Sequence, residues 1–274
     1  MLPTFVIGLR EGVEAALIVG IIAAFLVQEQ GRGALRGMWF GVGAAVGICL
    51  AIGIALDLVN EELPHRAQEG MASIIALLAV GAVTFMIVWM RRHARGIAKE
   101  LRANAAGALA SGTTGALVAM AFFAIIREGL ETVVFLLAAF QTSSNPLSAG
   151  FGALLGIGAA VVIGVAIYRG GIKLNLSRFF RITGVVLVLV AAGLVASSLH
   201  TAHEAGWLNS GQGHPLDLTW LVVAGTWTAS LLTGMLGLRP EPATIELAGY
   251  AIYALPMLLY LLLPDRLRLR SLRS

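Results

Sequence analysis

The motif Arg-Glu-Gly-x-Glu occurs twice in this chain, at 10–14 and again at 127–131. On a helix, residues three positions apart lie about 60° apart around the axis and about 4.5 Å apart along it. Glu11 and Glu14 therefore present two carboxylates on one helix face, and Arg10 lies beside Glu14 because the two are four residues apart. Such a face offers hard oxygen ligands to a cation.

The second motif repeats this arrangement with Arg127, Glu128 and Glu131. Gly12 and Gly129 keep each face thin, so that another helix or an ion can approach closely. If all four glutamates and both arginines ionise, the pair of motifs carries a formal charge of −2, which a divalent cation would neutralise. Two alternatives stay open: a carboxyl packed beside others can be protonated instead, and each arginine can simply pair with its own glutamates. The occurrence of the charged motif in two separate helices favours a cation site.

Composition places the motifs in a membrane. The chain has 274 residues, of which 58% are hydrophobic and 12% charged, against about 45–50% and about 25% in soluble domains. Its mean hydropathy is +0.87. The basic residues form short clusters between apolar runs, as in membrane loops, and do not suggest a nucleic-acid partner. A single cysteine, Cys49, excludes an internal disulfide or a cysteine-ligated cluster.

The sequence predicts an all-α, polytopic membrane protein with seven transmembrane helices. A spanning helix needs about 20 mostly apolar residues. Basic clusters follow the first, third, fifth and last spans, and positive loops stay in the cytoplasm, so the N-terminus is predicted outside and the C-terminus inside. Residues 218–238 are uncharged and about long enough to span, but a crossing there would put the basic tail outside, which favours a re-entrant or surface segment. The predicted spans are 3–27, 37–57, 70–90, 114–140, 148–168, 182–203 and 244–263.

The two motif helices are predicted to run in opposite directions, which indicates an inverted repeat. The following spans also match, with GVGAAV at 41–46 and GIGAAV at 156–161. Inverted repeats are common in transporters and place the site at the repeat interface near mid-membrane. We therefore predict one transmembrane domain, 1–274, made of a first three-helix repeat (1–92), a second inverted repeat (113–204), an extracytoplasmic or re-entrant segment (205–243) and a last helix with a basic tail (244–274).

Further polar side chains are predicted near the outer surface. His200, His203 and Glu204 end the sixth span, and Glu69 begins the third. Imidazole and carboxylate groups suit transition-metal ions, so these four are candidate outer entry ligands. The plainer interpretation is that they cap helix ends or lie in a solvated loop.

The sequence resembles the oxidase-dependent iron transporter family, and most closely its bacterial branch, the permease subunits of Efe-type ferrous-iron uptake systems. The resemblance covers nearly the whole chain and is weakest at 209–245. It rests on the two motifs and on the segments LREGVEAALIVG, FFAIIREGLETVVFLLAAFQ, GGIKLNLSRFF and VAAGLVASSLHTAHEAGWLN.

The resemblance implies an iron permease of the bacterial inner membrane and not an enzyme, with no catalytic residue and no cofactor beyond the transported Fe²⁺ or Fe³⁺. It also implies extracytoplasmic partners, a cupredoxin-like protein and a haem peroxidase. It assigns the four motif glutamates as iron ligands and the two arginines as their ion-pair partners: Glu11, Glu14, Glu128, Glu131, Arg10 and Arg127.

Other functions compete with iron import. A proton-coupled carrier of another divalent metal would use the same carboxylates. An intramembrane glutamate protease would need a Glu-Glu pair within a helix, but the pair at 61–62 is predicted in a loop. A purely structural membrane subunit is the last alternative. The sequence contains no GxxxxGK[ST] motif for ATP, so the energy would come from the membrane potential or from iron oxidation by a partner.

Overall fold

The computed structural model describes residues 1–29, 34–93, 114–141, 143, 145–169, 175–208 and 240–263, with single positions between 209 and 239. Regular structure in these segments is entirely α-helical, as predicted. Five of the helices, α2, α3, α6, α7 and α9, are long and apolar enough to cross a membrane. The seven described helices are α1 (Leu2–Glu29), α2 (Ala34–Glu62), α3 (His65–His93), α5 (Thr114–Gln141), α6 (Pro146–Tyr168), α7 (Leu176–Glu204) and α9 (Thr244–Leu262).

Each predicted span is a helix, but several helices extend beyond the apolar stretch that revealed them. Helix α7 begins at Leu176, where the Asn175 side chain accepts a hydrogen bond from the Arg178 backbone N–H. The prediction of a loop at 61–62 is wrong, because this Glu-Glu pair forms the last turn of α2. Hydropathy marks the part of a helix that suits lipid, whereas caps decide where the helix ends. The uncharged stretch at 218–238 lies almost wholly outside the described residues.

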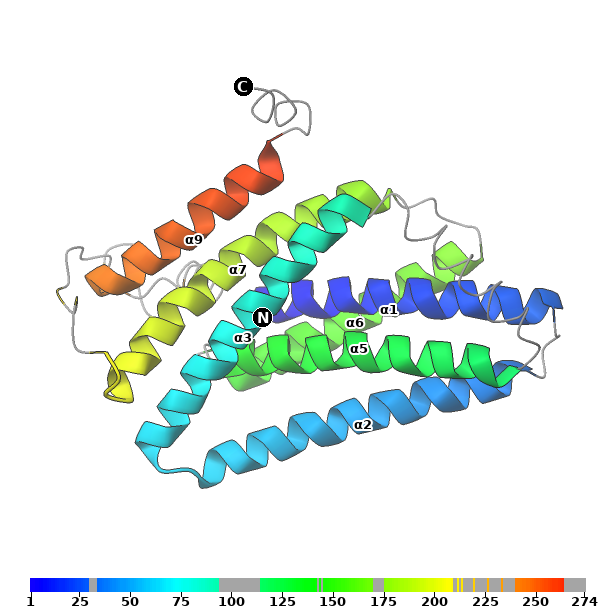
Figure 1. The fold of residues 1–274 in the computed structure, drawn as a ribbon, viewed down its shortest axis with the longest axis horizontal. Helices are drawn as coiled ribbons and strands as arrows, with labels where there is room; N and C mark the ends of the chain where they lie inside the picture. Colours follow the sequence, from blue (N-terminus) through cyan, green and yellow to red (C-terminus); the bar gives the residue numbers. More distant parts are fainter. Residues whose placement is uncertain are drawn as a thin grey trace.

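The helices form two groups (Figure 1). Helices α1, α2, α5 and α6 run side by side, and α3, α7 and α9 cross them at an incline. The largest contacts pair α1 with α6, α2 with α5, and α3 with α7, while α9 packs against α7. Helix α1 also contacts α5, so the two motif helices meet inside the bundle. Following the predicted orientation, we call the end of the bundle that holds Glu204 the outer end.

Glycines bring α1 and α6 into backbone contact. A Cβ added at Gly156 would overlap the carbonyl oxygen of Phe5, and one added at Gly12 would lie 2.6 Å from the Ala160 Cβ. Small residues allow such close approach in membrane helices, where van der Waals packing drives association. This packing fixes the position of the first motif along α6.

We therefore expect Gly156→Ala to destabilise the protein although alanine favours helix formation by about 1 kcal/mol. The overlap with Phe5 should cost about 1–3 kcal/mol, as overpacking does. The matched control is Gly158→Ala in the same helix, because no atom lies within 4 Å of a Cβ added there. Thermal unfolding in detergent should show a lower Tm for Gly156→Ala only; an unchanged Tm would contradict the close contact.

Candidate cation site

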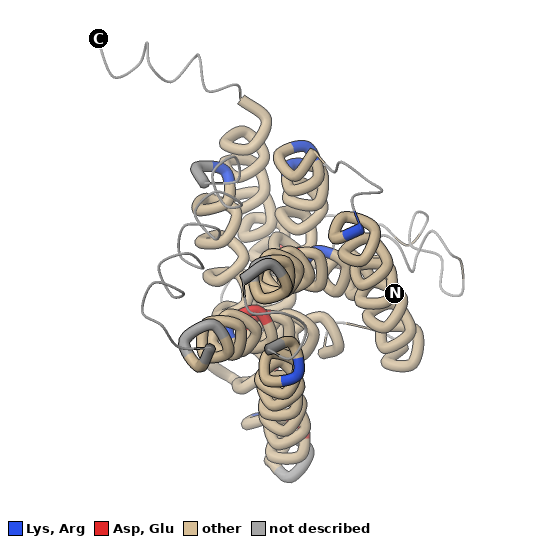
Figure 2. The backbone as a smooth tube through the Cα atoms, turned by 90° about the vertical axis from the view of Figure 1, so that its right-hand side faces the viewer, with Lys and Arg blue, Asp and Glu red and all other residues tan. Residues whose placement is uncertain are grey.

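The crossing of α1 and α5 brings carboxylates from both motifs together. Glu11 of α1 and Glu128 and Glu131 of α5 each offer one carboxylate oxygen, and these three oxygens lie within 4.8 Å of one another. Three oxygens at this spacing can bind one hard or borderline cation after small side-chain movements. In Figure 2, acidic positions lie among the helices at the centre of the bundle.

Glu11 is the carboxylate in this cluster with the fewest hydrogen-bond partners to offset its burial. Its residue is 1% exposed, and neither carboxylate oxygen has a hydrogen-bond partner. The buried Oε2 of Glu128 also has none. An ionised group in the membrane interior is costly unless it is paired. The arrangement therefore fits a cation seated between the three carboxylates.

The two motif arginines have different surroundings. Arg10 is 1% exposed, with its Nε 3.3 Å from Glu14 Oε1 and its guanidinium 5.9 Å from the centre of the Phe180 ring. Arg127 donates a hydrogen bond from Nε to Glu131 Oε1 at 3.1 Å, but 53% of its side chain is exposed. The motif on α1 is therefore sealed, and the motif on α5 is open on the side of its arginine.

Glu14 occupies a different place from the other three glutamates. The sequence predicted four carboxylate ligands, and the structure brings three of them within one cluster while Glu14 pairs with Arg10. Glu14 still lies close enough to interact electrostatically with Glu11 and Glu131. It thus balances Arg10 beside the cluster.

The candidate outer ligands divide into two sets. His200 contacts two carboxylates, with Nδ1 2.8 Å from Glu246 Oε1 and Nε2 3.1 Å from Glu204 Oε1. His203 faces elsewhere, because its Nδ1 lies 2.6 Å from the Leu208 carbonyl oxygen. Sequence reasoning did not connect Glu246 with His200, because the two are 46 positions apart in the chain.

Glu69 lies between a cavity and the group of His200, Glu204 and Glu246, which we call the outer cluster. Its carboxyl lies close enough to Glu204 for the two groups to interact electrostatically, and it also lines a cavity of about 150 Å³ between α2, α3, α5 and α7. On α5 this cavity begins at Ala138, two helical turns from Glu131. Six of its nine lining residues are polar, namely Asn60, Gln68, Glu69, Gln141, Ser197 and Thr201, and the other three are Ala72, Ala76 and Ala138.

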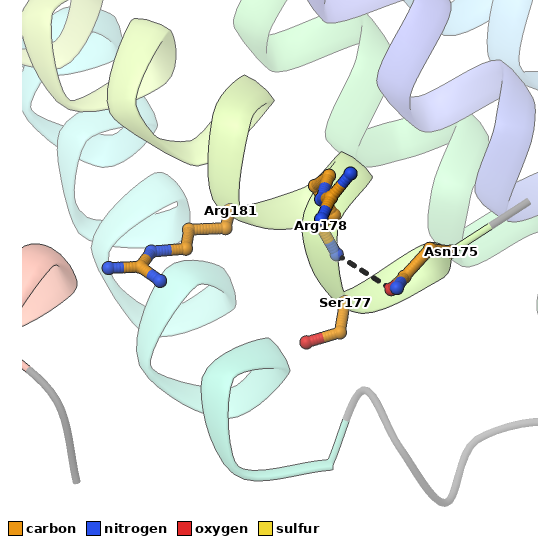
Figure 3. Close-up of a pocket in the computed structure, with 4 residues that line it drawn as sticks. All are labelled: Asn175, Ser177, Arg178 and Arg181. Atoms are coloured by element: carbon orange, nitrogen blue, oxygen red, sulfur yellow. Dashed lines mark hydrogen bonds between the residues drawn. The ribbon is translucent and has the colours of Figure 1, made fainter.

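A second hollow lies at the opposite end of α7 (Figure 3). It is lined by Asn175, Ser177, Arg178 and Arg181, and Figure 3 shows the hydrogen bond between Arg178 N and Asn175 Oδ1. Two guanidinium groups repel cations, so this hollow is not part of the cation site.

Comparison with known proteins identifies the family. The model of the iron permease FTR1 family matches residues 1–272. The chain belongs to the iron permease FTR1 family. It is 42% identical over 268 residues to the ferrous iron permease EfeU of Yersinia pestis, covering 97% of this chain and 95% of that protein. It is 41% identical over 277 residues to EfeU of Escherichia coli O6:H1, covering both chains fully.

These findings confirm the family predicted from the two motifs and the segments around them. The family and these relatives are named permeases, which confirms the prediction of a transport protein rather than an enzyme. No solved structure matches the chain.

The different burial of the two arginines predicts different costs of removing them. Arg10→Met should strongly lower the Tm of the cation-free protein, because losing one partner of a buried ion pair costs about 3–5 kcal/mol. The matched change Arg127→Met should lower the Tm less, because 53% of the Arg127 side chain is exposed. Thermal unfolding of both purified variants tests this, and equal Tm losses would contradict the asymmetry.

Proposed function

We propose that this chain imports iron across the bacterial inner membrane through the carboxylate cluster of Glu11, Glu128 and Glu131, with Glu14 beside it. The observation that carries the proposal is the buried Glu11 carboxylate, which has no hydrogen-bond donor and faces two carboxylates from another helix. Family membership supplies the identity of the ion. The three carboxylates agree with it, because oxygen ligands suit iron in either oxidation state.

The proposed topology has seven spanning helices, with the N-terminus outside and the C-terminus inside. Basic positions at the end of the bundle seen in Figure 2 support this orientation, because positively charged ends stay in the cytoplasm. The described basic residues near this end are Arg36, Arg91, Arg169, Arg178 and Arg181.

The proposed inverted repeat relates helices α1, α2 and α3 to α5, α6 and α7. Helix packing supports it. The contact of α1 with α6 corresponds to the contact of α5 with α2, and α3 packs against α7, its counterpart in the second repeat. Single contacts agree: Gly12 meets Ala160, and its counterpart Gly129 meets Cys49.

The contacts suggest a different register for the repeat than the sequence match does. Gly164 meets Ala16, and correspondingly Gly53 meets Val133. These contacts relate α2 to α6 by 111 positions, whereas the matching strings at 41–46 and 156–161 are 115 apart. The difference is about one helical turn, which a string of small apolar residues cannot distinguish.

The proposal keeps the extracytoplasmic partners that the resemblance implies, a cupredoxin-like protein and a haem peroxidase. The proposed cargo includes both Fe²⁺ and Fe³⁺, although the EfeU relatives are named ferrous iron permeases. The alternative cargo is another divalent metal, because Mn²⁺ favours the same oxygen ligands. Competition by Mn²⁺, Zn²⁺ and Pb²⁺ for iron uptake into liposomes separates these cargoes.

We expect Glu131→Ala and Glu14→Ala to abolish iron uptake while the protein still inserts in the membrane. The first removes a ligand, and the second leaves Arg10 without its partner beside the cluster. Accumulation of radiolabelled iron in liposomes measures the effect. Asp57→Asn is a control, because Asp57 is an exposed carboxylate on α2. Normal accumulation by both alanine variants would falsify the proposal, and Glu131→Gln separates loss of charge from loss of shape.

A further inference from the structure

The outer cluster has the arrangement of a metal-binding histidine supported by a buried acid. His200 lies on α7, and the Glu246 carboxylate that contacts its Nδ1 comes from α9. The Glu246 side chain is only 5% exposed, whereas the Glu204 side chain, at the Nε2 side of the ring, is 44% exposed. In metal sites the second ring nitrogen of a ligating histidine almost always donates its N–H to a carboxylate, carbonyl or water, which fixes the ring orientation.

The two ring nitrogens of His200 therefore have different roles. A neutral imidazole carries one N–H, whereas here both nitrogens lie within hydrogen-bonding distance of a carboxylate oxygen. The buried, shorter contact assigns Nδ1–H to Glu246 as donor. Nε2 is then the ring nitrogen available to a cation, and a cation bound there would lie between Nε2 and the Glu204 carboxylate.

A third carboxylate and a polar cavity lie on the Nε2 side. Glu69 from α3 lies close enough to Glu204 and His200 to interact electrostatically with both. The same Glu69 lines the cavity of about 150 Å³, whose other lining residues include three amides and two hydroxyl residues. The Asn60 Oδ1 atom in that lining is buried without a hydrogen-bond partner. A cation held by Glu69 would thus lie at the mouth of a chamber whose oxygens can replace part of its hydration shell.

We propose that His200 Nε2, Glu204 and Glu69 form a second, outer site for a divalent first-row transition-metal ion, with Glu246 as the positioning residue. This inference rests on the proposed function, because it supplies the step before the carboxylate cluster. In this site the Nε2 lone pair would bind the metal, while the Nδ1–H stays hydrogen-bonded to Glu246. His203 is not part of this site, because its ring faces the Leu208 carbonyl.

The ligand set gives the outer site a selectivity that the inner cluster lacks. The inner cluster offers carboxylate oxygens alone, which also suit Mg²⁺ and Ca²⁺. An imidazole nitrogen favours transition metals such as Fe²⁺ over those hard ions. The outer site would therefore select the ion before it enters the membrane interior.

Co²⁺ binding to the purified full-length protein tests the outer site by calorimetry and visible absorption. The triple variant Glu11→Gln, Glu128→Gln, Glu131→Gln removes the inner carboxylates, and we expect it to retain one equivalent of bound Co²⁺. Adding His200→Gln should abolish this binding, and adding Glu204→Gln should weaken it at least tenfold. His203→Gln is the matched control, because it makes the same chemical change one turn away and should alter neither affinity nor spectrum.

Glu246 has its own test as a positioning residue. Glu246→Leu should weaken Co²⁺ binding by about 10–100-fold, as loss of outer-shell partners does, and should change the Co²⁺ absorption bands. Glu246→Gln should restore most of the affinity, because the amide oxygen can still accept the Nδ1–H. Equal losses in both variants would show that Glu246 serves only packing.

The outer site and the proposed function fail in different ways. The outer site is overturned if the triple variant binds no Co²⁺, or if His200→Gln and Glu204→Gln leave its binding unchanged. The proposed function is overturned if the unaltered protein takes up no iron in liposomes, whatever the Co²⁺ result. In the otherwise unaltered chain, His200→Gln should raise the iron concentration for half-maximal uptake at least tenfold with little change in maximal rate. Elution of each variant as one symmetric peak in detergent confirms its folding.

Discussion

The cost of placing carboxylates inside a membrane protein is the constraint on which this structure depends. Each charged side chain at the centre of a spanning helix costs about 2.5–3.5 kcal/mol on insertion scales, and Glu11 has no hydrogen-bond donor to offset that cost. Arg10 supplies one buried positive charge, which forms an ion pair with Glu14. The Glu11 carboxylate and the Oε2 atom of Glu128 lack a hydrogen-bond partner at the crossing of α1 and α5, and this supports the proposed cation site.

Close helix packing makes this arrangement rigid enough to hold. Gly12 and Gly129 sit inside the motifs and face Ala160 and Cys49 of the neighbouring helices. Without side chains at these two positions, Ala160 and Cys49 pack directly against the motif helices, which restricts the rotation of each helix about its axis. The glutamates on either side of each glycine are then directed away from that contact and toward one another. The glycine in the motif is therefore as much a part of the site as the acids.

Sequence reasoning predicted the fold class, the seven helices and the motif residues, because hydropathy and buried charge are local properties of the chain. It did not predict the helix ends, such as Leu176, which depend on a capping side chain. It placed Glu14 beside Arg10, as the structure does, but it could not show that the cluster within 4.8 Å consists of Glu11, Glu128 and Glu131, because that depends on how α1 crosses α5. Glu246 could be connected with His200 only through the packing of α9 against α7, which no spacing in the sequence reveals.

The glycine contacts between α1 and α6 have a mechanical consequence. Helix α1 packs against α6 at Gly156, beside the Phe5 carbonyl oxygen, and at Gly12, beside the Ala160 Cβ, while α2 packs against α5 as a second pair. The oxygens of the proposed site are divided between the pairs, with Glu11 in the first and Glu128 and Glu131 in the second. A hinge or sliding movement between the two pairs would therefore change the distances between the proposed ligands. An ion held by both pairs would tie them together, and such a movement would release it.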